Sequence, residues 1–144
     1  MLERIKNIEE VYDVSSESLE CLKSIEYSGM FDGFKITTSK NIWYILISNI
    51  QQCCENFGYV SKPEDYKDYI GAAVYFISRT VRTIDDDIET IPLSSSSEYP
   101  NCMFITFYTD KGDLQFTAYN EHNGYYGHNV VIVKDTYLKD LKEL

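Results

Sequence analysis

Polar and aromatic side chains are concentrated in one stretch near the C-terminal end, residues 119–128. In order, these residues are Tyr119, Asn120, Glu121, His122, Asn123, Gly124, Tyr125, Tyr126, Gly127 and His128. Asparagine amides donate and accept toward ribose hydroxyls or a base edge, tyrosine rings stack on a purine, and glycines expose backbone N–H groups to phosphate oxygens. The stretch therefore predicts a nucleotide-type ligand. The alternative is an elaborate loop whose polar side chains satisfy its own backbone.

Two arginines are further candidates, because guanidinium is the best planar partner for a phosphate. Arg79 and Arg82 fall in a segment with strand character. Residues three apart on a strand point to opposite faces, so at most one of them is expected to face a given pocket. The alternative for each is an ordinary solvated surface group.

Catalysis is not expected from these residues. His122 and His128, with Glu121 and Asp110 nearby, contain the right atoms for a metal or acid–base site, but no recognisable motif spacing supplies a nucleophile or a metal set. The four cysteines lack the paired spacing of a zinc site and are expected to be reduced, buried thiols. The sequence thus predicts a protein that is not an enzyme and has no metal and no cofactor.

The elements that must position this chemistry are mainly strands. Residues 104–133 are expected to form an antiparallel meander, with Gly112 in the first turn and Asn123-Gly124 in the second. Residues 33–50 predict a β-hairpin, whose apolar run at 43–47 is typical of a strand covered on both faces.

Helices are expected beside these strands. Residues 72–84 predict one more strand, whereas apolar spacing and capping residues predict short helices in four places. These are residues 2–12, for which a turn-rich entry segment is the alternative, residues 16–28, residues 61–69 beginning at Ser61, and residues 137–144 capped by Asp135 or Thr136. The expected fold is α+β, with short N-terminal, middle and C-terminal helices around an antiparallel sheet, and the expected unit is one ligand-binding domain over residues 1–144.

The net charge and the hydrophobic pattern of the chain limit the classes of partner that it can bind. The chain has 144 residues and a net charge of −10, which disfavours a DNA or RNA polymer because phosphate neutralisation requires a basic face. No apolar run approaches the ~20 residues of a membrane span, and the charged N-terminal segment does not resemble a signal peptide. The expected location is the cytoplasm. Thirteen tyrosines suit ligand pockets and subunit interfaces, or simply a β-rich protein.

Four short motifs in a fixed order resemble one phage family. They are Cys53-Cys54-Glu55, Ile70-Gly71, Thr106-Phe107-Tyr108 followed by Lys111-Gly112, and Asn123-Gly124-Tyr125-Tyr126. The resemblance covers about residues 42–132. The family is the first-described type of phage Thoeris anti-defence proteins, sponges that sequester cyclic ADP-ribose-type signals.

The resemblance implies a non-enzymatic protein of the host cytoplasm that binds glycocyclic ADP-ribose and blocks activation of the Thoeris effector. It also implies a homo-oligomer, a dimer or an assembly of dimers, with pockets at subunit interfaces and, as in some relatives, a second site for cyclic oligonucleotides. Carried over by position, the ligand-binding candidates are Tyr119, Asn120, Asn123, Tyr125 and Tyr126, with Asn101 and Phe104 as further candidates.

One position departs from the family pattern. Relatives often carry arginine and then tryptophan in the strand before the Asn-Gly-Tyr-Tyr motif, where this chain has Ala118 and Tyr119. Arg79, Arg82 or backbone amides are then expected to meet the phosphates.

Two other functions remain as alternatives. An acidic mimic could inhibit a host DNA-binding protein by presenting carboxylates in place of phosphates. A small phosphodiesterase could degrade the signal instead of holding it.

Overall fold

The protein is built almost entirely from β-strands. A computed structural model describes residues 2–19, 21, 29–50, 56–83, 101–121 and 127–144. The strands are β1 (Glu3–Ser15), β2 (Met30–Thr38), β3 (Ile42–Ser48), β4 (Asn56–Lys62), β5 (Ala73–Thr83), β6 (Asn101–Thr109), β7 (Gly112–Glu121), β8 (Asn129–Lys134) and β9 (Tyr137–Glu143). A short 3-10 helix, η2 (Tyr66–Tyr69), follows β4. No α-helix occurs in the described residues, so the predicted α+β fold is wrong.

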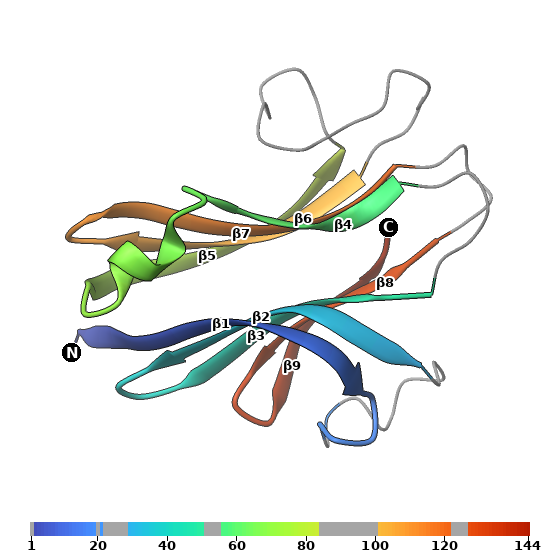
Figure 1. Cartoon of the computed structure of the whole chain (residues 1–144), viewed down its shortest axis with the longest axis horizontal. Helices are drawn as coiled ribbons and strands as arrows, with labels where there is room; N and C mark the ends of the chain where they lie inside the picture. The colour runs from blue at the N-terminus through green and yellow to red at the C-terminus, as the bar shows by residue number, and fades with distance from the viewer. Residues whose placement is uncertain (1, 20, 22–28, 51–55, 84–100, 122–126) are drawn as a thin grey trace.

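The nine strands form one sheet in the order β4-β7-β6-β5-β1-β2-β3-β8-β9. Every neighbouring pair is antiparallel. The sheet is folded over so that β4–β7 form one layer and β1–β3, β8 and β9 form the other (Figure 1). Among the described residues, only Glu3 and Arg4 of β1 pair with β5, at Val74 and Ala73, so strand pairing joins the two layers at that corner.

The predicted helix at residues 2–12 is instead most of strand β1, and a β-bulge explains the error. The pairing of β1 with β2 shifts register between Ile5 and Asn7. An extra residue on a strand restores the same facing after three positions instead of two. Ile5 and Ile8 therefore both enter the core at helix-like spacing, while Val11 packs on the other face of the sheet. The bulge therefore accounts for the step from Ile5 to Ile8, which the sequence pattern alone assigned to a helix.

The predicted C-terminal helix is also wrong, since residues 137–143 are strand β9 on the edge of the sheet. Asp135 lies in the β8–β9 turn with φ of 55°. Its carboxylate accepts a hydrogen bond from the Ile42 N–H at 2.8 Å, and its own N–H donates to the Ile42 carbonyl at 2.7 Å. The residue expected to cap a helix thus ties this turn to β3.

The middle helix is shorter than predicted. Ser61, expected to begin the helix at residues 61–69, instead pairs with Phe116 across β4 and β7. Strand pairing continues through Lys62, and helical structure is confined to η2. Of the helix expected at residues 16–28, residues 20 and 22–28 lie outside the described residues, and residues 16–18 form a turn.

The predicted hairpin at residues 33–50 is confirmed by β2 and β3, and the strand at 72–84 by β5. The first turn of the predicted meander is also confirmed, because Gly112 has φ of 118° between β6 and β7. The pairing of the third strand is wrong: β8 lies between β3 and β9 in the other layer.

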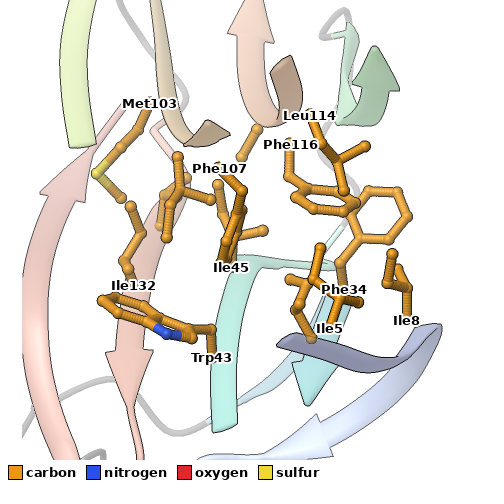
Figure 2. Packing of buried hydrophobic residues seen from close by; sticks show 14 of the residues in the cluster. Ile5, Ile8, Phe34, Trp43, Ile45, Met103, Phe107, Leu114, Phe116 and Ile132 are labelled. Atoms are coloured by element: carbon orange, nitrogen blue, oxygen red, sulfur yellow. The ribbon is translucent and has the colours of Figure 1, made fainter. Parts of the chain in front are cut away.

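Aromatic and branched side chains from both layers fill the space between them (Figure 2). Phe34 of β2 meets Phe116 of β7 with ring centroids 4.7 Å apart, and Trp43 of β3 meets Phe107 of β6 edge-on at 6.1 Å. Leu46 points the other way into a second cluster with Phe31, which confirms a β3 strand covered on both faces. No helix in the described part of the chain is both long and apolar enough to cross a membrane.

Candidate functional site

A pocket of about 380 Å³ lies between β5 of one layer and β3, β8 and β9 of the other. We call it the basic pocket. Its lining residues are Glu3, Trp43, Val74, Tyr75, Phe76, Ile77, Arg79, Lys134 and Lys139. Three lysine or arginine side chains and one carboxylate thus face it, in a chain whose net charge is −10. The local charge balance is the reverse of the global one, which favours an anionic ligand here.

Strand pairing places one cation of the basic pocket against an aromatic ring. Trp43 and Lys134 are opposite each other in the β3–β8 register. The Lys134 ammonium lies 5.6 Å from the centroid of the indole ring, within cation–π distance. The ammonium is therefore held at the pocket by the ring beneath it.

The same tryptophan provides a buried donor. Trp43 is only 6% exposed, and its indole Nε1 has no hydrogen-bond acceptor among the described residues. An indole N–H can only donate, and a buried donor without a partner costs about 1–3 kcal/mol. This nitrogen is fully buried, so a ligand in the pocket does not reach it without a rearrangement of the side chain.

Arg79 bridges the two layers at the pocket. Its Nη1 lies 3.1 Å from Oδ2 of Asp140, which joins β5 to β9. Both side chains are about one-third exposed, and such ion pairs contribute about 0–1 kcal/mol to stability. The pair positions the guanidinium at the pocket while contributing little to folding.

Glu3, the one carboxylate in the lining, is engaged by its own layer. It is buried, and its Oε2 accepts hydrogen bonds from the Thr38 hydroxyl at 3.0 Å and the Asn41 amide at 2.9 Å. These bonds hold the β2–β3 turn onto β1. The Glu3 carboxylate therefore has a structural role, since both hydrogen bonds go to the β2–β3 turn.

Two exposed aromatic rings lie beside the cations. Tyr75 and Phe76 are 59% and 62% exposed, and Phe76 also contacts the ring of Tyr108 at 5.7 Å. Ring faces at such a position can stack on a base, while the cations meet phosphate oxygens. The basic pocket thus combines both groups that a small nucleotide requires.

Of the residues predicted from sequence, Arg79 is the one that the structure places in the basic pocket. Arg82 lies on β5, but its side chain is outside the described residues. Asn123, Tyr125 and Tyr126 also lie outside the described residues.

Tyr119 and Phe104 lie elsewhere, on the outer face of the β4–β7 layer. Tyr119 is 5% exposed and packs with Cys102, Val60 and Phe104. Its hydroxyl would be 3.0 Å from a Cβ atom added at Gly58, which shows how closely its ring covers that glycine. The structure gives these two residues a packing role separate from the basic pocket.

Asn120 faces the interior and ties the layers together. It is fully buried, and its amide donates to the Leu144 carbonyl at 2.9 Å. Asn101 is its register partner on β6 and is half-buried. His128 exchanges backbone hydrogen bonds with Leu144 and stacks on Phe57 at 3.9 Å. These polar groups connect strand ends, and none of them lines the basic pocket.

Sequence reasoning missed Trp43, Lys134 and Lys139. A lone tryptophan in an apolar run and two lysines near a chain end carry no recognisable motif. They become a site only through the β3–β8–β9 pairing, which places residues about ninety positions apart opposite each other. The useful signal was the tryptophan itself, since its N–H requires a partner wherever it is buried.

Among the described residues, no group of histidine, cysteine, aspartate or glutamate side chains could hold a metal ion. The chain belongs to the family described as a domain of unknown function, DUF7448, whose model matches residues 4–132. No curated protein and no solved structure matches the chain.

Proposed function

We propose that this protein binds and sequesters a phosphate-bearing, cyclic nucleotide-type immune signal, with glycocyclic ADP-ribose as the expected ligand. The observation that carries the proposal is the convergence of Arg79, Lys134 and Lys139 on one pocket beside the Trp43 ring. The motif resemblance to the Thoeris anti-defence sponges supplies the identity of the signal. Holding it keeps it from its effector inside the infected cell.

The energies required are compatible with this pocket. Hydrogen bonds to charged groups contribute about 1.5–3 kcal/mol each, and base stacking on an aromatic ring contributes about 1–3 kcal/mol. A sponge needs a dissociation constant near nanomolar, about −12 kcal/mol. A pyrophosphate on three cations and an adenine on Tyr75 or Phe76 reach that range only if the pocket is preorganised. The Arg79–Asp140 and Lys134–Trp43 contacts provide that preorganisation.

The side chains that line the basic pocket support a non-enzymatic role. The groups that face it are donors and ring faces, and the single carboxylate, Glu3, is engaged by Thr38 and Asn41. Cleavage of a phosphodiester requires a positioned nucleophile together with a general acid or base. The lining is suited to holding the ligand without cleaving it.

We further propose that a second copy of the chain covers this pocket. Beyond Val74, β5 has no partner on its β1 side among the described residues. Tyr75, Phe76 and Val81 are exposed along it. A homodimer through this edge would bury these rings and close the pocket over its ligand. Light scattering on the purified protein should therefore give a dimer or an assembly of dimers.

The direct test is calorimetric titration of the full chain with glycocyclic ADP-ribose. Lys134→Ala should weaken binding about tenfold to a hundredfold, the equivalent of one lost charge-assisted bond. Lys35→Ala is the matched control, because Lys35 lies 5.9 Å from the ring centroid of Tyr44 but does not line the basic pocket. Equal affinities of the two variants would remove the basic pocket from the function.

The fate of the ligand separates the proposal from its alternatives. After binding, the complex is heated and the released compound is chromatographed. Intact glycocyclic ADP-ribose supports sequestration, whereas a cleaved product would make the protein a phosphodiesterase. Absence of binding together with salt-sensitive capture of a basic DNA-binding protein would favour an acidic mimic.

A further inference from the structure

A second and chemically different cavity, of about 540 Å³, lies at another edge of the molecule. It opens between β4 and the β1–β2 pair. Its lining includes Glu10, Phe34, Tyr59, Lys62, Glu64 and Tyr66. We call it the aromatic pocket. None of its lining residues also lines the basic pocket.

Two tyrosine rings of the aromatic pocket are each nearly perpendicular to a phenylalanine ring. Phe34 is buried at 3% exposure and also belongs to the core. The Tyr59 ring meets it at an interplanar angle of 84° with centroids 5.1 Å apart, and the Tyr66 ring meets it at 77° and 5.5 Å. All three rings line the same pocket, so rings in two nearly perpendicular orientations form adjacent walls of it, like two sides of a box. Such aromatic cages recognise quaternary ammonium groups through the negative faces of the rings.

A carboxylate held by two phenols stands beside this box. The Tyr12 hydroxyl donates to Oε2 of Glu10 at 2.6 Å, and the Tyr59 hydroxyl donates to the same oxygen at 3.2 Å. Both phenols use Oε2, so Oε1 receives neither bond. Two donors fix the orientation of the carboxylate and keep its charge at the pocket.

The remaining charges favour a cation here. Burial raises the pKa of Tyr59 far above its ordinary value, helped by its hydrogen bond with Tyr12 and the Glu10 charge. Burial, and then the Glu10 charge, also raise the pKa of Tyr66. Both rings therefore stay neutral. Two carboxylates, Glu10 and Glu64, then face one lysine, Lys62, which disfavours a phosphate in this pocket.

The pocket's own lysine does not fill the box. In the described part of the chain, lysine ammonium groups lie over the rings of Tyr44 and Trp43. No such contact is formed by Lys62 with Tyr59 or Tyr66 within that part of the chain. The rings therefore remain available to a ligand.

We propose that the aromatic pocket binds a small organic cation, an alkylammonium compound whose charged end lies among Phe34, Tyr59 and Tyr66 with Glu10 as its counter-charge. This site is independent of the proposed nucleotide function, because the two pockets share no residue. The protein would thus take an anion at one edge and a cation at another.

The test uses choline and its uncharged isostere 3,3-dimethylbutan-1-ol, which places carbon where choline has nitrogen. Each is titrated into the isotope-labelled full chain while amide resonances are followed by NMR. Choline should shift the Ser61 and Glu64 amides and bind at least tenfold more tightly than the isostere. The difference isolates the charge, since the two probes have nearly the same shape.

Variants locate the site. Tyr66→Leu removes one wall of the box and should weaken choline binding roughly twofold to thirtyfold, the range of cation–π contributions. Glu10→Gln keeps the acceptor for both phenols but removes the charge, and should also weaken binding. Tyr137→Leu, a change at a 68% exposed ring on β9, should leave it unchanged. Lys134→Ala should also leave choline binding unchanged. A loss of choline binding can therefore be distinguished from a loss of nucleotide binding at the basic pocket.

Three results would overturn the proposal. One is the absence of any shift with choline at millimolar concentration. Another is equal binding of the neutral isostere, which would make the cavity a plain apolar pocket. The last is unchanged choline affinity in a folded Glu10→Gln protein.

Discussion

At the scale of single residues, Glu10 accepts hydrogen bonds from two phenols and contributes to raising the pKa of both. Tyr59 and Tyr12 both donate to it, and both have a raised pKa. For Tyr12, which is at the surface, the hydrogen bond to Glu10 is the main cause. For Tyr59, burial is the main cause. The pKa is thus raised in both phenols, but the main physical cause differs between them.

The Tyr59 shift predicts alkaline sensitivity. Its pKa is near 10 in the unfolded chain and higher in the folded one. The stabilisation is therefore fully present below about pH 10 and is lost as pH rises further, because only the unfolded state then releases the proton. The urea midpoint of the wild type should fall more steeply between pH 10 and 11 than that of Tyr59→Phe. Parallel slopes for the two proteins would contradict the shift.

The candidate site shows what residue types reveal without a structure. Arg79 was predicted because guanidinium pairs with phosphate, and it does lie in the basic pocket. Asn120 was predicted for the same ligand because its amide can donate. It donates instead to the Leu144 carbonyl. Side-chain chemistry identifies which bonds a residue can form, but not which neighbour will take them.

At the scale of elements, close approach between strands makes one glycine indispensable. A Cβ atom at Gly33 of β2 would overlap the backbone carbonyl oxygen of Ile45 and lie 3.0 Å from the Leu46 Cα on β3. Backbone atoms in a paired strand cannot move aside as a side chain can. The β2–β3 hairpin therefore depends on the absence of a side chain at this position.

Gly33→Ala should destabilise the protein by about 1–3 kcal/mol, the usual cost of overpacking. Gly58→Ala is the matched control on β4, where the new methyl group would meet the hydroxyl end of the Tyr119 side chain. The Tyr119 ring must then shift by a few tenths of an ångström, which is less than the backbone overlap at Gly33 requires. Alanine also loses less backbone entropy on folding than glycine does. We expect a smaller effect at Gly58 in urea unfolding. A larger loss at Gly58 than at Gly33 would show that the hairpin tolerates the extra carbon.

At the scale of the whole molecule, the two layers depend on their shared core. In the part of the chain that the structure describes, backbone pairing joins them only where β1 meets β5, together with the bonds that Ile5 makes to Gly71 and Ala72. Phe116 contacts both Phe34 and Phe107, and so connects rings from each layer. Neither layer can bury its inner face without the other, which predicts a single cooperative unit.

Phe116→Ala should therefore destabilise both layers at once, by about 3–5 kcal/mol. Fluorescence of Trp43, the single tryptophan, reports on the β3 layer, and circular dichroism reports on all strands. The two probes should shift together to the same lower urea midpoint. Leu141→Ala, at an exposed position on β9, should change the midpoint little. Separate transitions for the two probes would show that the layers unfold independently.

The sequence by itself determined those strands whose facing pattern or turn is unambiguous. The run at residues 43–47, the alternation at 114–119 and the glycine at 112 reflect short-range rules of facing and turn conformation. The same rules failed at β1 because a bulge changes the facing period there, and at β9 because pairing with β8 overrode its helix-like spacing. Local patterns cannot reveal which strands will pair.

Only the tertiary structure decided the location of the candidate site. The basic pocket gathers Trp43, Arg79, Lys134 and Lys139 from β3, β5, β8 and β9. Their proximity results from β8 leaving β7 for the opposite layer, where it completes a sheet with β3. Burial of the apolar faces of both layers favours that pairing. The free energy of this burial depends on the whole chain, so no single segment of the sequence reveals it.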